Sequence, residues 1–166
     1  MEHFATCSPA LEQPMNEHRK RILAVASAGG HWVQLLRLRP AFAGHEVRFL
    51  STSAALASQI RPHPLYVVND ASMWDKVGLA KMAVRIAKVM LAYRPHVIIT
   101  TGAAPGFFGI LVGRLLGAKT IWIDSIANAE ELSLAGRKAK RWADHWLTQW
   151  PELAREEGPH YIGSVI

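Results

Sequence analysis

Short apolar runs recur along the chain and alternate with longer stretches of mixed polarity. The runs occupy positions 21–27, 47–51, 65–68, 97–101, 120–124 and 146–149. Most of the stretches between them are long enough for a helix, and this alternation predicts βαβ units with a parallel sheet. The 166 residues, 50% of them hydrophobic, suffice for one domain with its own core. We therefore expect an α/β fold, a single Rossmann-like doubly wound parallel sheet over residues 21–166.

The first 20 residues differ in character from the rest of the chain. Residues 1–20 contain glutamates and prolines but no apolar run, so we expect a disordered tail rather than a secretory signal or a membrane-spanning helix. Met15 is an alternative translation start. The single cysteine, Cys7, excludes an internal disulfide and favours a reducing compartment such as the cytoplasm.

The chain carries a formal net charge of +6 at pH 7. This excess of cations indicates an anionic partner, which can be nucleic acid, anionic lipid or a phosphorylated substrate. The sequence contains none of the standard nucleic-acid-binding modules. Its His, Cys and carboxylate residues show no metal-ligand spacing, and no Gly-x-Ser-x-Gly elbow is present, so neither a metal hydrolase nor an esterase is expected.

A polar turn with a glycine pair follows the first apolar run directly, and it contains Ser27, Gly29, Gly30 and His31. Glycines let the backbone approach a ligand closely, and the free N–H groups of the helix that follows favour an anion. His31 is a candidate hydrogen-bond donor, or a base for a sugar hydroxyl, because an imidazole exchanges its proton near neutral pH. A purely structural cap is the alternative. The spacing matches neither the dinucleotide fingerprint nor the Walker motif.

Two later strands also end in small or polar residues. Gly102, Ala103 and Gly106 follow the run at 97–101, and Asp124 and Ser125 follow the next one. If the two glycine turns lie side by side, their N–H groups and helix dipoles can hold a diphosphate. Tight packing of small residues is the alternative for the second turn. A helix N-cap is the alternative for the Asp124 region.

A long amphipathic helix is predicted over residues 74–93, ending before Pro95. Its apolar face is predicted to contain Leu79, Met82, Ala83, Ile86, Met90 and Tyr93. The opposite face carries a basic stripe formed by Lys81, Arg85 and Lys88. A second basic cluster, close to Trp142 and Trp146, contains Arg137, Lys138, Lys140 and Arg141. Both groups are candidates for contact with lipid headgroups or a partner, and ordinary solvated helix faces are the alternative.

Four segments, taken in order, resemble a known family. They are residues 27–31, 95–106, 116–125 and 161–164. Together they resemble bacterial exopolysaccharide glycosyltransferase subunits of the PssD type and the membrane-anchoring subunit of the eukaryotic dolichol-linked UDP-N-acetylglucosamine transferase. More distantly, they resemble the N-terminal domain of MurG. The resemblance covers about residues 21–166, which is the whole expected domain.

The resemblance implies the N-terminal, acceptor-binding half of a split GT-B glycosyltransferase. A separate partner subunit would bind the nucleotide sugar, and the two would transfer a sugar from a UDP-sugar to a polyprenyl-diphosphate-linked saccharide. Both glycine turns would face the acceptor, with His31 as the candidate base or as a residue that orients the acceptor, and no cofactor is expected. We expect peripheral attachment to the inner face of the cytoplasmic membrane through the basic helix. The alternatives are a non-catalytic recruitment scaffold and a small basic domain that binds nucleotides or nucleic acid.

Overall fold

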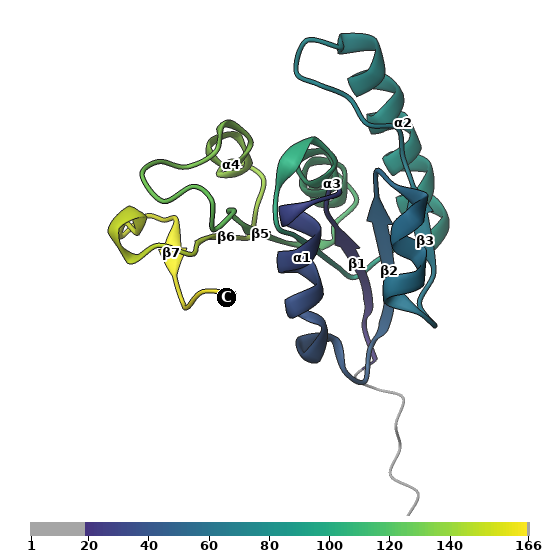
Figure 1. Ribbon diagram of the computed structural model, residues 1–166, viewed down its shortest axis with the longest axis horizontal. Helices are drawn as coiled ribbons and strands as arrows, with labels where there is room; N and C mark the ends of the chain where they lie inside the picture. The colour runs from purple at the N-terminus through teal and green to yellow at the C-terminus, as the bar shows by residue number, and fades with distance from the viewer. Residues whose placement is uncertain (1–18, 166) are drawn as a thin grey trace, which may run out of the picture.

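The computed structural model describes residues 19–165, so most of the predicted tail, with Cys7 and Met15, lies outside the described residues. Within this range one parallel sheet contains seven strands in the order β3-β2-β1-β4-β5-β6-β7. The strands are β1 (Arg21–Val25), β2 (Glu46–Ser51), β3 (Leu65–Val67), β4 (Val97–Thr100), β5 (Lys119–Ile123), β6 (His145–Thr148) and β7 (His160–Tyr161). The predicted α/β Rossmann-like fold is confirmed (Figure 1).

Helices cover both faces of this sheet. The α-helices are α1 (Gly30–Arg37), α2 (Lys76–Tyr93), α3 (Ala103–Leu115) and α4 (Leu134–Ala139). Short 3-10 helices add η1 (Arg39–Phe42), η2 (Ala54–Ile60) and η3 (Pro151–Leu153). In the described part of the chain, α2, α3 and α4 pack on one face, whereas α1, η1 and η2 pack on the other.

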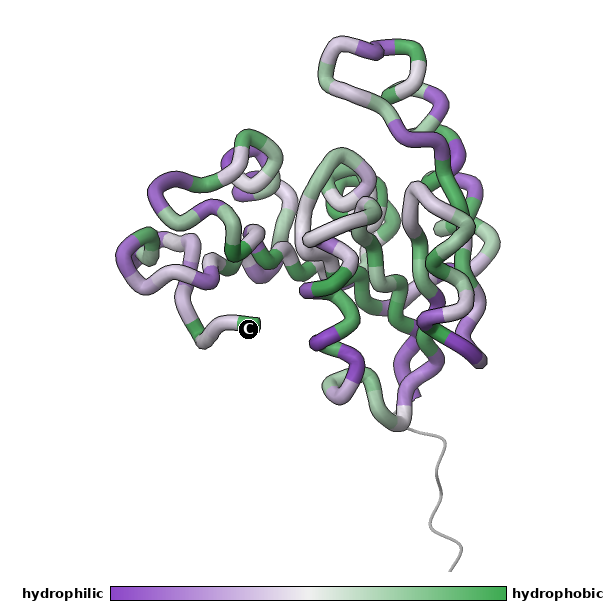
Figure 2. The backbone as a smooth tube through the Cα atoms, in the orientation of Figure 1, coloured by the Kyte–Doolittle hydropathy of each residue, from purple (hydrophilic) through white to green (hydrophobic). Residues whose placement is uncertain are grey.

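Each face of the sheet has its own hydrophobic core, because successive strand residues point to opposite sides. In β1, Leu23 and Val25 pack under α2 and α3, whereas Ile22 and Ala24 pack under α1. Figure 2 shows the resulting pattern, with hydrophobic residues concentrated along the central strands. Short apolar runs thus form strands buried on both faces, as expected for a parallel sheet.

The predicted long helix is α2, and both of its ends have a local cause. The carboxylate of Asp75 accepts a hydrogen bond from the Gly78 N–H, which caps the first turn. Arg94 ends the helix in the left-handed conformation, just before Pro95. On the predicted apolar face, the buried residues are Met82, Ile86, Met90 and Tyr93. Leu79 and Ala83 on the same face are half-buried.

The strand order reverses between β1 and β4. The chain proceeds from β1 to β2 and β3 on one side, and from β4 to β7 on the other. In doubly wound sheets, ligands bind at the carboxyl ends of the strands at such a switch point. The fold therefore directs attention to the turns that follow β1 and β4.

Candidate functional site

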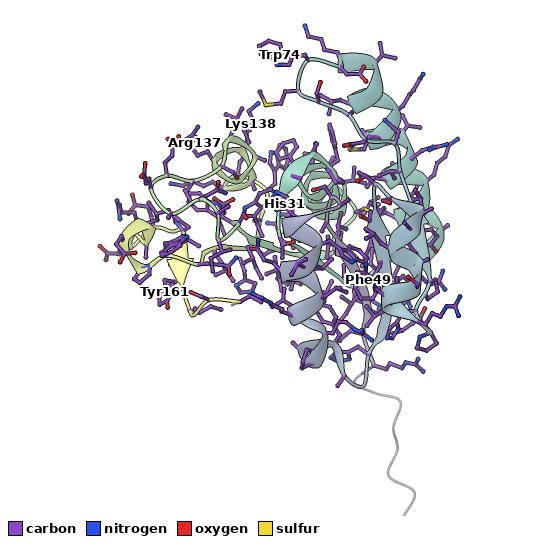
Figure 3. The ribbon with its side chains drawn as sticks, viewed as in Figure 1. His31, Phe49, Trp74, Arg137, Lys138 and Tyr161 are labelled. Carbon is purple, nitrogen blue, oxygen red and sulfur yellow. The ribbon has the colours of Figure 1, made fainter. Side chains whose placement is uncertain are left out.

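The two predicted glycine turns meet at the switch point. Gly29, Gly30 and His31 follow β1, and Gly102 follows β4, the neighbouring strand. Figure 3 shows His31 at the end of α1 that lies beside α3. The side-by-side arrangement on which the predicted diphosphate site depends is therefore present.

Thr101 holds His31 through two hydrogen bonds. The His31 Nδ1 atom lies 2.8 Å from the Thr101 carbonyl oxygen, and the Thr101 hydroxyl donates to the His31 carbonyl oxygen over 2.6 Å. A carbonyl oxygen only accepts hydrogen bonds, so Nδ1 carries the proton and the neutral ring keeps its lone pair on Nε2. The site thus presents a half-buried imidazole in one tautomer, with Nε2 available as a base.

Gly102 permits this close approach of the two turns. Its φ of 124° and ψ of −163° lie in a region that only glycine adopts readily. A Cβ atom on this residue would lie 2.8 Å from His31 Cε1 and 2.9 Å from His31 Nδ1. Any side chain at position 102 would therefore displace the imidazole.

Both helices that begin at the site lack a side-chain cap. Gly29 caps α1 and Gly102 caps α3, and neither cap makes a side-chain hydrogen bond. Gly29 and Gly30 are exposed, and Ser27 is half-exposed beside them. Ala103, the first residue of α3, has a φ of 65°, which is a strained value for a residue with a side chain. The backbone N–H groups and the positive ends of two helix dipoles therefore lie close to His31.

Gly106, the third residue predicted in the second turn, has a packing role. It is buried, and a Cβ atom there would collide with the Thr100 hydroxyl oxygen. This is the close-packing alternative stated for the second turn. Direct contact between Gly106 and a ligand is not supported by its position.

Asp124 and Ser125 also differ from their predicted role, because both side chains face inward. The Asp124 carboxylate accepts hydrogen bonds from the Ser133 N–H at 2.9 Å, the Ser133 hydroxyl at 2.6 Å and the Trp122 indole at 3.3 Å. The Ser125 hydroxyl accepts from the Gln34 amide at 3.1 Å. These side chains are 2% and 6% exposed, so they brace the edge of the sheet rather than present groups to an acceptor.

Sequence reasoning missed Thr101 and the buried amides of Gln34 and Gln149. Thr101 could have been noticed as a hydroxyl residue directly before the second glycine turn. Gln34 lies one helical turn after Gly30 on α1, and Gln149 directly follows β6. Nothing in the local sequence distinguishes these two glutamines from surface residues.

The predicted basic stripe lies on the exposed side of α2, away from Leu79. Lys81 and Arg85 border a surface hollow that they share with Asp70 and Asp75. Lys88 is also exposed. The two carboxylates reduce the positive potential of this side of α2.

The second basic group lies beside an apolar groove. The groove has a volume of about 180 Å³. Its lining comes from the segment before α2, the first turn of α2, α3 and α4: Met73, Leu79, Ala104, Phe107, Phe108, Leu134, Ala135 and Lys138. Arg137 is exposed on α4 beside Lys138, and Trp74 projects from the segment before α2 (Figure 3). The Arg141 guanidinium lies 5.5 Å from the ring centre of Trp142.

Residues 19–165 contain neither a candidate metal site nor a helix suited to cross a membrane. No three side chains of the His, Cys, Asp and Glu types gather in a way that could hold a metal ion. Among the helices in this range, none combines the length and the apolar character needed to cross a membrane.

The fold matches solved structures of MurG and of UDP-N-acetylglucosamine 2-epimerase. The chain superposes on MurG from Acinetobacter baumannii with a TM-score of 0.70 and 17% identity, over 87% of this chain and 45% of MurG. It superposes on UDP-N-acetylglucosamine 2-epimerase from Rickettsia bellii with a TM-score of 0.67 and 11% identity, over 89% of this chain and 46% of the epimerase. The chain thus spans less than half of either protein. At this level of identity the match concerns the fold alone, and it defines a Rossmann-like domain of the GT-B type.

Sequence comparison identifies the family. The chain is 31% identical over 180 residues to the UDP-N-acetylglucosamine transferase subunit ALG14 of Eremothecium gossypii, which covers 89% of this chain and 80% of the relative. It is 36% identical over 77 residues to alg14 of Schizosaccharomyces pombe, which covers 43% of this chain and 37% of the relative. No family model matches the chain. The chain belongs to the ALG14 family and is a glycosyltransferase subunit, so the predicted family resemblance is confirmed.

Proposed function

We propose that this chain is the acceptor-binding, membrane-associating subunit of a two-subunit glycosyltransferase, with residues 21–166 as its acceptor-binding domain. The enzyme transfers a sugar from a UDP-sugar to a polyprenyl-diphosphate-linked saccharide. The relatives are named as subunits of a UDP-N-acetylglucosamine transferase, which favours that donor and a donor-binding partner subunit. The isolated chain is then inactive until the partner binds.

The observation that carries this proposal is the meeting of two glycine turns at the switch point. Both α1 and α3 begin there with glycine caps, and His31 lies between them. Helix N-termini attract negative charge through their free N–H groups and their dipoles. The diphosphate of a polyprenyl-linked acceptor would supply that charge, and its proposed contacts are Ser27, Gly29, Gly30 and Ala103, which are exposed or half-exposed in these turns.

His31 is the base in the proposed mechanism. Its Nε2 atom takes the proton from the acceptor hydroxyl, while the bond from Nδ1 to the Thr101 carbonyl oxygen keeps the ring in place. The hydroxyl oxygen then attacks the anomeric carbon of the donor sugar from the face opposite the diphosphate. The bond between that carbon and the UDP oxygen breaks, UDP leaves with the electron pair, and the configuration inverts. Groups of the partner subunit stabilise the departing diphosphate.

Membrane contact is proposed at the apolar groove and its basic edge. Trp74 is 89% exposed and Met73 is 59% exposed in the segment before α2, so neither side chain is used by the core. Indole rings favour the interface between headgroups and acyl chains, and each nearby cation contributes about 1 kcal/mol toward an anionic surface. Lys138 at the groove, Arg141 and Arg137, which also pairs with Glu131 at 3.0 Å, are the proposed cations. The proposed location is the cytoplasmic face of the membrane. The stripe of Lys81, Arg85 and Lys88 is assigned a smaller contribution, because it lies on the opposite side of α2 from the groove.

Transfer activity tests the catalytic part of the proposal. The chain is purified from membranes together with its donor-binding partner and assayed with UDP-N-acetylglucosamine and a polyprenyl-diphosphate-linked acceptor. We expect transfer by the complex, none by the isolated chain, and a decrease in kcat of about 10²- to 10⁴-fold for His31→Ala. His45→Ala is the control and should retain activity, because His45 lies directly before β2, at the amino ends of the strands and away from the site. Full activity of His31→Ala would instead favour a recruitment scaffold without a catalytic role.

Sedimentation with vesicles tests the membrane part. Vesicles that contain the anionic lipid phosphatidylglycerol, which gives them a negative surface potential, are mixed with the native chain and two variants. We expect Trp74→Ala combined with Lys138→Ala to release the protein, and Lys81→Ala combined with Lys88→Ala to release much less. Equal release by both double variants would contradict the groove as the contact surface.

A further inference from the structure

Two buried glutamines connect the C-terminal segment of the chain to the helix that carries His31. Gln34 is 5% exposed on α1, and Gln149 is 1% exposed directly after β6. Neither side chain lies in the proposed acceptor site. Buried amides are retained only when their polar atoms are paired, so their partners show what they hold together.

Every polar atom of the Gln34 side chain is used. Its Nε2 donates to the Gly30 carbonyl oxygen at 3.3 Å and to the Ser125 hydroxyl at 3.1 Å. Its Oε1 accepts from the Ile126 N–H at 3.1 Å and from Gln149 Nε2 at 2.7 Å. Gln34 therefore ties the first turn of α1 to the loop that follows β5.

Gln149 extends this network to the end of the described chain. Its Nε2 also donates to the Asp124 carbonyl oxygen at 2.9 Å, and its Oε1 accepts from the Val165 N–H at 2.8 Å. The Ser164 hydroxyl donates to the Gln149 carbonyl oxygen at 2.7 Å, and Arg37 of α1 donates to the Val165 carbonyl oxygen at 3.2 Å. Figure 1 shows the chain after β7 turning back toward α1.

The partners determine which way each amide points. Val165 N–H can only donate, so it directs Gln149 Oε1 toward the C-terminal segment and Nε2 toward Gln34. Gln34 must then receive that bond on Oε1, which directs its own Nε2 toward the Gly30 carbonyl oxygen. The direction of donation is thus continuous from residue 165 to the residue before His31.

We propose that Gln34 and Gln149 are positioning residues that hold the first turn of α1, and with it His31, at the sheet edge, and that residues 164–165 complete this support. Thr101 holds the His31 ring through a hydrogen bond, and the Gln34 amide holds Gly30, the residue directly before His31. The effect on catalysis rests on the proposed function, in which His31 is the base. The mechanical link itself does not depend on that function.

Amide hydrogen exchange of the full-length chain tests the link without any activity. The Val33 N–H donates to the Gly29 carbonyl oxygen at 3.2 Å, so its exchange reports on the first turn of α1. Gln34→Met and Gln149→Met keep the side-chain length but remove all amide hydrogen bonds. We expect each to accelerate Val33 exchange about tenfold, and the double variant to do no more than either alone, because the residues act as one unit. Unchanged Val33 exchange in both single variants would overturn the proposal.

Two further variants keep this test decisive. Asp144→Asn is the matched control, because Asp144 accepts from the Thr120 N–H at 2.9 Å in a polar network at the amino ends of the strands, far from α1. This variant lowers the global stability but leaves the local opening of α1 unchanged, so Val33 exchange through that local opening should not accelerate. Ser164→Ala changes only an exposed side chain, so it tests the link even if the glutamine variants fail to fold. We expect a smaller acceleration, about threefold, from the loss of one hydrogen bond.

Kinetics of the assembled complex separate positioning from binding. We expect Gln34→Met and Gln149→Met to lower kcat about ten- to hundredfold while KM for the acceptor changes less than about twofold, because neither side chain contacts the acceptor. Faster Val33 exchange with no loss of kcat would overturn the positioning role. If even the native complex transfers no sugar, the proposed function fails, and the exchange data still decide whether the link exists.

Discussion

Replacing Gly102 by alanine tests whether the contact between the two turns holds His31. The new residue must adopt a φ of 124° and a ψ of −163°, a conformation that costs about 1–3 kcal/mol for a residue with a side chain. Its Cβ would lie 2.8 Å from His31 Cε1 and 2.9 Å from Nδ1, so the ring must turn away. That movement breaks the bond to the Thr101 carbonyl oxygen, which adds about 1 kcal/mol. We therefore expect a loss of about 2–4 kcal/mol in unfolding free energy.

Two measurements separate the parts of this loss. Urea unfolding gives the change in unfolding free energy, and ¹⁵N NMR of the imidazole nitrogens reports whether His31 keeps its proton on Nδ1. Gly117→Ala is the matched control, because Gly117 has a φ of 79° and no neighbouring atom within 4 Å of an added Cβ. This control loses about 1–2 kcal/mol through backbone strain alone, and its His31 tautomer is unchanged.

One outcome would show that the contact at Gly102 does not hold His31. If Gly102→Ala loses no more stability than Gly117→Ala and His31 keeps its Nδ1 proton, the imidazole is not held by this contact. The tautomer assigned to the proposed base would then have another cause. A loss of the fixed tautomer in Gly102→Ala alone supports the contact as the cause.

Three further predictions concern the supporting structure. Burial acts to raise the pKa of the Asp144 carboxyl, but the Thr120 N–H and hydroxyl, with Arg114 and Lys119, outweigh it and hold the pKa below its usual range. We therefore expect Asp144→Asn to lose roughly 2 kcal/mol of unfolding free energy in urea at pH 7. This difference from the native protein shrinks as the pH falls below about 4, because the native carboxylate then becomes protonated. Burial raises the pKa of Tyr93 to about 12. The native chain therefore loses the stability contributed by this hydroxyl between about pH 10 and 12, and Tyr93→Phe lacks this loss. At pH 7 the variant has an unfolding free energy about 1 kcal/mol lower, because it lacks the 2.9 Å hydrogen bond from the Tyr93 hydroxyl to the Glu46 carbonyl oxygen. Gly113→Ala collides with Ile98 Cδ1 and loses about 1–3 kcal/mol, and adding Ile98→Val, which removes that atom, restores part of the loss in the same assay.

Much of the fold was predictable because its signals are local. The six predicted strands correspond to β1 to β6, and the face predicted for α2 is buried at Met82, Ile86, Met90 and Tyr93. Only β7 was missed. It has two exposed residues and no apolar run, and it forms because Leu147 of β6 pairs with His160. Such a strand depends on its neighbour and leaves no pattern of its own.

The candidate site was predictable only in part. Each glycine turn was visible in the sequence, but their adjacency required β1 to pair with β4, which are more than 70 residues apart along the chain. The direction of the side chains after β5 was not predictable, because Ser133 and Gln34 turn Asp124 and Ser125 inward. A carboxylate after a strand has the same local sequence whether it faces a ligand or the interior.

By itself the sequence determined the alternation of strands and helices, the glycine turns and the family, because these depend on residue order and short-range periodicity. Only the tertiary structure decided that Thr101 selects the tautomer of His31 and that Gln34 and Gln149 join α1 to the C-terminal segment. The physical reason is distance along the chain: His31 and Thr101 are 70 positions apart, and the two glutamines are 115 positions apart. Hydrogen bonds over such separations form only after the sheet has brought its strands together.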